Sequence, residues 1–600
     1  MIFRTMSRVV ALLFLASAVL FAAPSAPKTP KSYVAPKKLP GSNVIPPNRL
    51  ADWTPGVTVG VPGGIPTDRT HLIDVTKDPY NADNTGANDA QPAIVKAIAD
   101  AKDKDVVYLP AGKYRINTTF GPGTKQITIR GAGPDKTILM AYNKVYSTIS
   151  LGASGGADWS WSSPQASITG SPKKGATVLT ADMNALVNTP VGALCQIALK
   201  NDLTLPVWSH SNWNYLRRQK VRITEKTATT ITIFPPLLFD LPSELEPKLN
   251  AAARHAEFSG VEDLTVDGTN AEAPNGLIGM GQCYGCWVKN VVVKNCARYC
   301  FGVGDSLQCE IRHSFIGHRK QPFGPNGGGI LFGGVSSCLV EDNIVAVTFP
   351  HMEIDASSGN VFAYNFCDDT GIQGDILGCT INANHGPHSN FNLYEGNYAP
   401  KFQSDGYHGS ASHDTLYRNW FHGSSTHTNN FWICINLNRF ARDYNLVGNV
   451  LGRKGATWIY DNCNADFGGF GYQQHFIFMF GMPNMGNGAF SGKAQISKGK
   501  YPADWKTLLA SPMGKGPGSG GFQELDLDVR ATALVKGNFN YADNGVNKSE
   551  SLGSAKLPAS LYLKAKPAWF GNLAWPPFGP DTEFEKHQLP AQVRYEEMSK

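Results

Sequence analysis

The sequence predicts an all-β fold, a solenoid of stacked parallel strands, and three observations indicate it. Between residues 286 and 450, a few apolar residues are repeatedly followed by a polar turn residue. These segments end at Asn290, His313, Asn343, Asn365, Asn397, Asn419 and Asn449. Subtracting the positions gives intervals of 23, 30, 22, 32, 22 and 30 residues, and the chain has 62 glycines to form turns. Short strands at such a period stack as one coil per repeat.

The bulk composition is that of a folded, turn-rich protein. Hydrophobic residues make up 42% of the 600 residues and charged residues 17%, which excludes a disordered chain. An elongated solenoid can carry this length as one domain. The net charge of +6 is modest, and no run of Lys or Arg indicates a nucleic-acid surface. We therefore expect no nucleic-acid partner, and we expect a monomer.

The first 26 residues are typical of a cleaved secretory signal peptide. Arg4 and Arg8 precede an apolar run over residues 9–21, which is too short to span a bilayer and is followed by small residues. We therefore expect a secreted or periplasmic protein whose mature chain has no transmembrane segment. Residues 27–70 are rich in Pro and Lys and predict an extended linker.

Residues 71–150 predict an N-terminal cap and the first coils. A turn at residues 83–89 precedes a helix in which Ile94, Ile98 and Ala101 form one apolar stripe. Such a helix covers the open end of a solenoid, whose core and strand edge would otherwise be exposed.

This region resembles the N-terminal segment of the pectate-lyase superfamily. The resemblance rests on the order of its parts: Asp74, the turn at residues 86–89, the capping helix, and the segment Leu109-Pro-Ala-Gly-Lys-Tyr-Arg-Ile116. Members of that superfamily are right-handed parallel β-helices, so the resemblance implies that fold. It does not select a reaction, because the superfamily includes lyases, hydrolases, esterases, epimerases and phage tailspikes.

The remaining chain divides into three parts. Residues 151–245 contain hairpin-like strands and predict an inserted antiparallel β subdomain. Residues 246–490 form the main parallel β-helix, and residues 491–600 supply a last coil and an aromatic, proline-rich covering tail. Four tryptophans of the insertion either stack on sugar rings or anchor it to the solenoid: Trp159, Trp161, Trp208 and Trp213.

The eleven cysteines allow two interpretations. Short spacings could outline a zinc site formed by Cys283, Cys286, Cys296 and Cys300. The alternative is small buried residues stacked on neighbouring coils, with local disulfides. We favour this alternative, because Cys286 and Cys309 share one repeat position and Cys338 lies one place off it.

The repeat also predicts where polar groups gather. Adjacent coils lie about 4.8 Å apart, so equivalent positions are neighbours. Counting from the repeat ends places Asp368, Asp369, Lys401, Asp405 and His427 on one face. Six of the fourteen histidines lie between residues 385 and 427. Titratable groups clustered on the loops of a rigid scaffold are typical of an active site.

Two chemistries fit these residues. A uronate lyase needs a base and a neutralised sugar carboxylate, often with calcium. Lys401 or His408 would be the base, and calcium would be held by Asp368, Asp369 and Asp405. A glycoside hydrolase would instead use Asp369 and Asp405 as its two carboxyl groups. The further catalytic candidates are His385 and His427, and the substrate-binding candidates are His388, Arg418, His422, Arg442 and Trp432.

Neither family pattern is complete. The Asp368–Asp369 doublet followed by His385 resembles polygalacturonases, but Glu353-Ile-Asp355 stands where they carry Asn-Thr-Asp. Lys401 and His422 are similar to the Lys and Arg pair of chondroitinase- and alginate-type lyases, except that the Arg is missing. We expect a secreted enzyme that degrades a polysaccharide, a lyase in preference to a hydrolase. The alternative from another class is a non-catalytic glycan-binding or surface-structural protein.

Overall fold

The chain divides into two compact units, Met1–Tyr33 and Val34–Lys600, and the second contains the whole fold considered below. A computed structural model describes residues 33–144, 147–152, 165–201, 214–252, 254–272, 275–320, 328–368, 381–406, 408–423, 433–456, 458–461, 476–481, 526–547 and 550–598. The predicted signal peptide lies outside these residues. Within them, no helix is long and apolar enough to cross a membrane.

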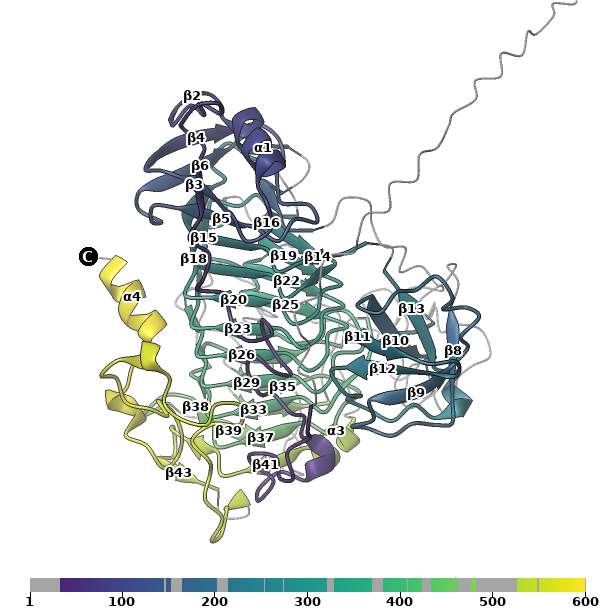
Figure 1. Ribbon diagram of the computed structural model, residues 1–600. Helices are drawn as coiled ribbons and strands as arrows, with labels where there is room; N and C mark the ends of the chain where they lie inside the picture. Colours follow the sequence, from purple (N-terminus) through teal and green to yellow (C-terminus); the bar gives the residue numbers. More distant parts are fainter. Residues whose placement is uncertain are drawn as a thin grey trace, which may run out of the picture. The chain divides into compact units, whose positions relative to one another are not determined.

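The second unit is built on a parallel β-helix whose successive coils add strands to three columns, which confirms the predicted fold class (Figure 1). The first column consists of β1 (Leu72–Asp74), β3 (Val106–Leu109), β5 (Thr128–Gly131), β15 (Gly260–Asp267), β18 (Trp287–Lys294), β20 (Glu310–Arg312), β23 (Leu339–Glu341), β26 (Val361–Ala363), β29 (Leu393–Glu395), β33 (Thr415–Tyr417), β37 (Asn445–Val447) and β41 (Leu534–Lys536).

The second column joins the same sheet through β15 and β18, which run through both columns. Its other strands are β2 (Thr85–Asp89), β4 (Gly112–Ile116), β6 (Thr137–Ala141), β21 (Phe315–Gly317), β24 (Ile344–Ala346), β27 (Phe366–Asp368), β30 (Tyr398–Ala399), β34 (Trp420–Phe421), β38 (Val450–Leu451) and β42 (Phe539–Asn540), with β43 (Gly545–Val546) antiparallel at the end.

The third column is a separate parallel sheet. It consists of β7 (Ile149–Ser150), β16 (Asn275–Gly281), β19 (Tyr299–Gly304), β22 (Ile330–Gly333), β25 (Met352–Asp355), β28 (Ile381–Asn382), β31 (Phe402–Ser404), β35 (Ile433–Leu437), β40 (Phe476–Phe480) and β39 (Ile459–Asp461). Two short pairs, β14 (Ala256–Glu257) with β17 (Cys283–Tyr284) and β32 (Ala411–Ser412) with β36 (Ala441–Arg442), complete the coils.

A helix caps the N-terminal end of these coils. Helix α1 (Gln91–Asp100) buries Ile94, Ala97 and Ile98, the side predicted by their spacing. Two further helices, α3 (Leu527–Thr532) and α4 (Pro590–Met598), belong to the C-terminal region.

A ladder of buried asparagines runs along the corner between the first and second columns. Each ladder side chain accepts hydrogen bonds from the backbone and side-chain amides of the preceding member, and it also donates to a backbone carbonyl. The members are Asn343, Asn365, Asn397, Asn419, Asn449 and Asn538. The last link spans 89 residues of sequence, so the coil carrying β41 continues the same repeat.

The residue before each ladder asparagine has a positive φ and makes the corner. Examples are Tyr364 at 54° and Gly396 at 66°. Asn290 and His313 occupy this turn position, with φ of 53° and 52°, and not the ladder itself. Their repeat ends were therefore predicted one position too early, and Ser314 is the residue whose amide reaches Asn343 Oδ1.

A second ladder runs along the corner that leads into the first column. Cys309 N lies 3.1 Å from Cys338 Sγ, and Cys338 N donates to Asn360 Oδ1. Asn360 then donates to Asn392, which donates to Asp414 Oδ1. The pairing of β18, β20 and β23 puts Cys286, Cys309 and Cys338 at one register position, so the one-residue offset expected for Cys338 is wrong.

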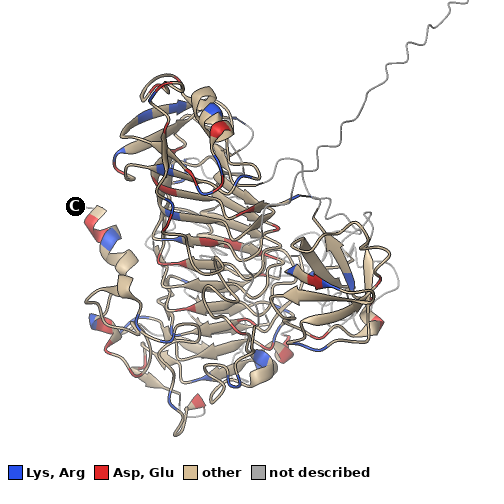
Figure 2. Ribbon diagram, in the orientation of Figure 1, with Lys and Arg blue, Asp and Glu red and all other residues tan. Residues whose placement is uncertain are grey.

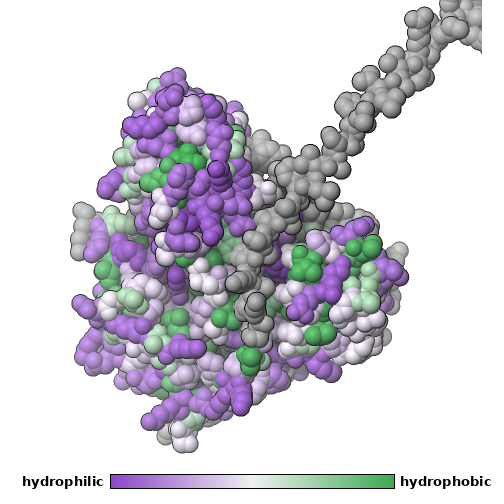
Figure 3. Space-filling view, in the orientation of Figure 1, coloured by the Kyte–Doolittle hydropathy of each residue, from purple (hydrophilic) through white to green (hydrophobic). Residues whose placement is uncertain are grey.

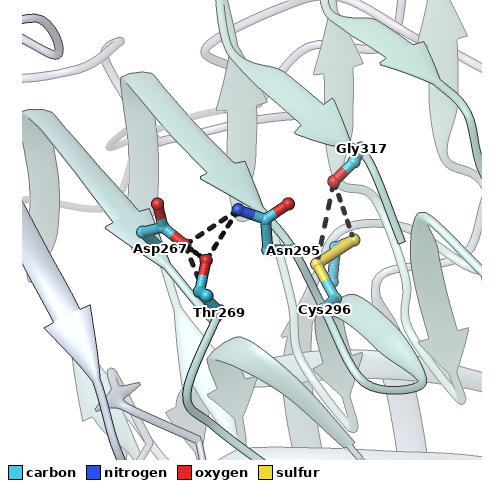
Figure 4. The surroundings of a disulfide bond; sticks show 6 residues. Asp267, Thr269, Asn295, Cys296 and Gly317 are labelled. Atoms are coloured by element: carbon cyan, nitrogen blue, oxygen red, sulfur yellow. Dashed lines mark hydrogen bonds between the residues drawn. A yellow bond between two sulfur atoms is a disulfide. The ribbon is translucent and has the colours of Figure 1, made fainter. Parts of the chain in front are cut away.

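The cysteines are buried residues of the core, as the stacking interpretation predicts. Cys283, Cys286, Cys309 and Cys338 are free and buried, whereas Cys296 forms a disulfide with Cys300. Figure 4 shows this disulfide beside the carbonyl of Gly317, with Asn295 bonded to Asp267 and Thr269. Burial raises the pKa of the Cys309 thiol, so these sulfurs behave as small apolar groups.

The insertion folds as a small closed antiparallel barrel beside the third column (Figure 1). Its strands are β8 (Ala166–Thr169), β9 (Val178–Ala181), β10 (Leu194–Leu199), β11 (Arg217–Lys226), β12 (Thr230–Phe234) and β13 (Lys248–Ala251). Strand β11 attaches the barrel to the β-helix. Its Arg222 pairs with Glu257 at 2.9 Å and its Lys220 pairs with Asp305 at 2.6 Å. The four tryptophans of the insertion lie outside the described residues.

Residues 44–61 pack onto the β-helix, so the expected linker is wrong for this part of residues 27–70. Leu50, Trp53 and Val61 are buried, and Trp53 Nε1 donates to the carbonyl of Phe391. Apolar side chains spaced among the prolines supply this contact, which a composition argument overlooks.

The C-terminal tail lies along the first and second columns. Tyr562 donates to Glu341 at 2.6 Å, and the Leu561 amide donates to Glu395 at 2.8 Å. Helix α4 adds an ion pair from Arg594 to Asp342. The tail therefore covers this side of the β-helix.

We predict that Asn397→Ala lowers the free energy of unfolding by about 3–5 kcal/mol. The substitution leaves the backbone and side-chain amides of Asn365 without their buried acceptor, and it removes the side-chain donor to the Phe362 carbonyl. Denaturant unfolding measures the loss. The exposed Asn184→Ala is the matched control, expected within about 0.5 kcal/mol of the parent. Equal small effects would show that the ladder contributes little.

We predict that Asp414→Asn stabilises the protein most at alkaline pH. Burial raises the pKa of Asp414 from 3.8 to about 8. The folded state then holds a proton that the unfolded state releases, so stability falls as pH rises from about 4 to about 8. Asparagine removes this slope and keeps the bond to Asn392. The gain in unfolding midpoint should be smallest at pH 5 and largest at pH 8, and a gain that is constant over this range would contradict the assignment.

Candidate active site

Two carboxylates point outward from the third column at the centre of the β-helix. In β25 the side chains of Met352 and Ile354 enter the core, whereas Glu353 and Asp355 are partly exposed. This is the period-2 alternation of a strand with one buried face. Glu353 accepts a hydrogen bond from the Tyr299 hydroxyl at 2.7 Å. Asp355 accepts one from the Gly386 amide at 2.6 Å.

A histidine and a third carboxylate follow on the next coils. His385 Nδ1 lies 2.7 Å from Asp405 Oδ2, and the Asn382 amide donates to the same oxygen at 3.2 Å. Asn382 pairs with Glu353 across β25 and β28, so this group continues the same outward face. The ring of His408 packs edge-on against His385, with centroids 5.0 Å apart. We call Tyr299, Glu353, Asp355, His385, Asp405 and His408 the acidic cluster.

The surroundings within the acidic cluster shift the pKa values of Asp355 and His385 upward by different amounts. Burial and the neighbouring charge of Glu353 together raise the pKa of Asp355 to about 7, against the opposing charge of His385. Burial alone would lower the pKa of His385, but the hydrogen bond and charge of Asp405 raise it to about 10. At neutral pH the cluster therefore holds a protonated His385 and an Asp355 that can give up a proton.

The barrel brings cations to this face. Lys220 of β11 bonds to Asp305 and to Gln196. Arg218 on the same strand lies against Gly334, because a methyl group added there would be 3.5 Å from the guanidinium carbon. Gly334 donates its amide to the backbone carbonyl of Asp355. In Figure 2 most residues of the β-helix strands are uncharged, and Lys or Arg and Asp or Glu residues are scattered among them.

The structure brings together three of the predicted catalytic residues: His385, Asp405 and His408. Lys401 is buried immediately before β31, where it is poorly placed to meet a polymeric substrate. Asp369, His427 and Trp432 lie outside the described residues. Asp368 ends β27 in the second column, whereas Asp405 follows β31 in the third. These two aspartates therefore do not share the single face predicted for them.

Four of the residues predicted to bind substrate contact other side chains of the protein. His388 is buried between Ser410 and Ser412, and burial lowers its pKa well below the usual value. Arg418 is covered by the tail and pairs with Asp581 at 2.6 Å. Burial lowers the pKa of His422 to about 3, and its ring stacks on Tyr398. Arg442 pairs with Asp526 at 2.7 Å, next to α3. Each of these four side chains has protein partners, and their role in substrate binding stays a prediction.

Calcium remains a prediction. Among the residues described, no three His, Cys, Asp or Glu side chains are arranged to hold a metal ion. Of the three proposed ligands, Asp405 is bonded to His385 and Asn382. We therefore derive no chemical step through a metal.

Sequence reasoning overlooked Tyr299, Glu353 and Asp355. Glu353-Ile-Asp355 was treated as a defective version of another family's motif. The usable signal was the alternation of apolar and acidic residues over Met352–Asp355, one coil before the predicted cluster. Tyr299 has no comparable signal, because its role depends on which coil stacks next to which.

We predict that Asp405→Asn lowers the pKa of His385 by more than one unit. The substitution removes the ion pair that keeps the imidazole protonated despite burial. Titration of isotopically labelled histidines by NMR measures the change, with His385→Gln assigning the resonance. Asp240→Asn, in an exposed pair with Lys173 on the barrel, should leave this titration unchanged. An unaltered pKa in Asp405→Asn would show that other groups hold the proton.

The comparisons with solved structures give distant similarities. The tailspike of Pseudomonas phage phi297 is 13% identical, with a TM-score of 0.45 over 65% of this chain and 72% of the tailspike. The A-module of the mannuronan C-5 epimerase of Azotobacter vinelandii is 13% identical, with a TM-score of 0.35 over 68% and 93%. A surface adhesin of Streptococcus pneumoniae is 11% identical, with a TM-score of 0.34 over 64% and 84%. No curated protein matches the sequence.

The N-terminal coils match a family model. Residues 73–187 match the family described as rhamnogalacturonase A/epimerase, pectate lyase-like. The matched region contains α1 and the first strands of each column. The N-terminal coils are therefore similar to that pectate-lyase-like family, and the stacked parallel coils show that the chain folds as a parallel β-helix.

Proposed function

We propose that the protein is a secreted carbohydrate-active enzyme that hydrolyses a polysaccharide at the acidic cluster. The observation that carries this proposal is a carboxyl group able to hold a proton near neutral pH, Asp355, next to a second carboxylate on the same face. The family matched by residues 73–187 is described by a polysaccharide hydrolase and an epimerase, which supports a carbohydrate substrate. The predicted signal peptide supports export.

Asp355 serves as the general acid in this proposal. Its pKa of about 7 lets it protonate the glycosidic oxygen as the bond breaks. Glu353 serves as the general base that activates water, because it is partly exposed and lies two residues along the same strand. The Cα atoms of two residues at this spacing in a strand lie roughly 6.6 Å apart. This is near the lower end of the separation of about 6.5–9.5 Å between the two carboxyl groups of inverting hydrolases.

The remaining members of the acidic cluster position these two. Tyr299 orients Glu353 through its 2.7 Å hydrogen bond. His385 is held by Asp405, and its positive charge opposes the effect of burial on Asp355. The Gly386 amide fixes one oxygen of Asp355, which leaves the other to meet the substrate.

A lyase is the second candidate. His408 packs against His385 at the edge of the acidic cluster, where an imidazole could remove a sugar proton. A lyase product contains a new carbon–carbon double bond, whereas a hydrolase product does not. The two reactions are therefore distinguished by ultraviolet absorbance of the product.

We predict that Asp355→Asn and Glu353→Gln each reduce polysaccharide cleavage by a factor of about 100 to 10,000. Release of reducing ends from a panel of acidic and neutral polysaccharides measures activity. Asp240→Asn is the control, since this carboxylate is exposed on the barrel. The parent's activity should fall as pH rises through about 7, because Asp355 then loses its proton.

Three outcomes would contradict the assignment. Full activity in Asp355→Asn would exclude it as the acid. Ultraviolet-absorbing products would show that the reaction is an elimination and not a hydrolysis. Binding without cleavage across the whole panel would favour the non-catalytic glycan-binding alternative.

A further inference from the structure

We propose that Arg218, carried by the inserted barrel, is an anion-binding residue that makes the site select acidic polysaccharides. This inference rests on the proposed function, because it names the substrate class of the same site. The ligand group is a carboxylate or a sulfate on a sugar next to the bond that is cleaved.

The barrel presents Arg218 to the face that carries the acidic cluster. Arg218 lies on β11, two residues before Lys220, which pairs with Asp305 at the end of β19. Its guanidinium lies against Gly334, at the end of β22. Because Gly333 pairs with Asp355 across β22 and β25, this position is one coil away from the proposed acid.

Within the described part of the chain, the charges of Asp305 and Asp355 act on Arg218, but neither carboxylate is bonded to it. Arg218 makes no ion pair or hydrogen bond with the described residues, and its Nε atom is buried without an acceptor. Of these two carboxylates, Asp305 has the larger effect on Arg218, and it already accepts a hydrogen bond from the ammonium group of Lys220 at 2.6 Å. The residue is only half-buried, so an external ligand can reach it.

A second arginine lies on the other side of the two carboxylates. Arg298 covers the ring of Tyr299, with its guanidinium carbon 5.1 Å from the ring centroid, and Tyr299 bonds to Glu353. Arg298 also makes no ion pair with the described residues, and its Nε has no acceptor among them. Arginines thus flank Glu353 and Asp355 on two sides, which suits a polymer that carries several negative charges.

The chemistry of an unpaired guanidinium favours an anion. Partial burial removes water from the charge without placing a protein carboxylate within ion-pair distance, which costs free energy until a ligand supplies one. The planar fork of arginine matches carboxylate and sulfate oxygens in pairs. A neutral sugar hydroxyl gives neither the charge nor the paired geometry.

Binding measurements in the Asp355→Asn background test this proposal without turnover. Isothermal titration measures the affinities of oligogalacturonate, its methyl-esterified form and chondroitin sulfate oligosaccharides. Each ligand is titrated into the parent, Arg218→Gln and Arg218→Lys. We expect Arg218→Gln to weaken binding of a charged ligand at least tenfold and to leave binding of the methyl ester unchanged. Arg218→Lys should weaken it less. Lys173→Gln, which removes an exposed positive charge elsewhere on the barrel, is the matched control.

The outcomes separate this inference from the proposed function. Loss of affinity for oligogalacturonate alone identifies a carboxylate ligand, and loss for the sulfated ligand alone identifies a sulfate. Equal affinity of Arg218→Gln and the parent for every charged ligand would overturn the inference, whether or not the parent cleaves polysaccharides. Charge-dependent binding through Arg218 by a parent that cleaves nothing would support it and contradict the hydrolase. Thermal unfolding of each variant establishes that the barrel remains folded.

Discussion

Each coil must turn between its first and second strands without leaving buried backbone groups unpaired, and the asparagine ladder meets this requirement. A residue with positive φ makes the corner, and the next side chain both accepts from the preceding coil and donates to a backbone carbonyl. An amide is suited to this because it has donors and an acceptor but no charge. The ladder thus links the coils from β24 to β42 in one register, from Asn343 to Asn538.

The second ladder shows how far the requirement can be met by other residues. The same position is occupied by cysteine on the earlier coils, by asparagine at positions 360 and 392, and by aspartate at position 414. A sulfur or a protonated carboxyl can accept the amide of the preceding coil as the asparagine does. At Asp414 burial opposes the charged carboxylate although the amide of Asn392 would bond to either form, so this coil is sensitive to pH.

The sequence predicted the parallel β-helix because the ladder is visible as a period, but it located only part of the site. Asp405, His385 and His408 lie together because they follow the strands of consecutive coils. The burial of Arg418 and His422 could not be predicted, because the residues that cover them are distant in sequence, as Asp581 is from Arg418. Asp355 was overlooked because its pKa depends on stacking against other coils, which no local pattern records.

The third column differs from the other two in what covers it. The tail seals the first and second columns with bonds such as Tyr562 to Glu341, so buried charges there, including Arg418, are satisfied within the protein. On the view in Figure 3, hydrophobic residues form only small patches among hydrophilic ones. The third column instead faces a barrel attached through β11, whose cations only partly match the carboxylates opposite. Since a structural contact would pair all of these charges, the mismatch leaves this face as the one where a charged ligand gains most from binding.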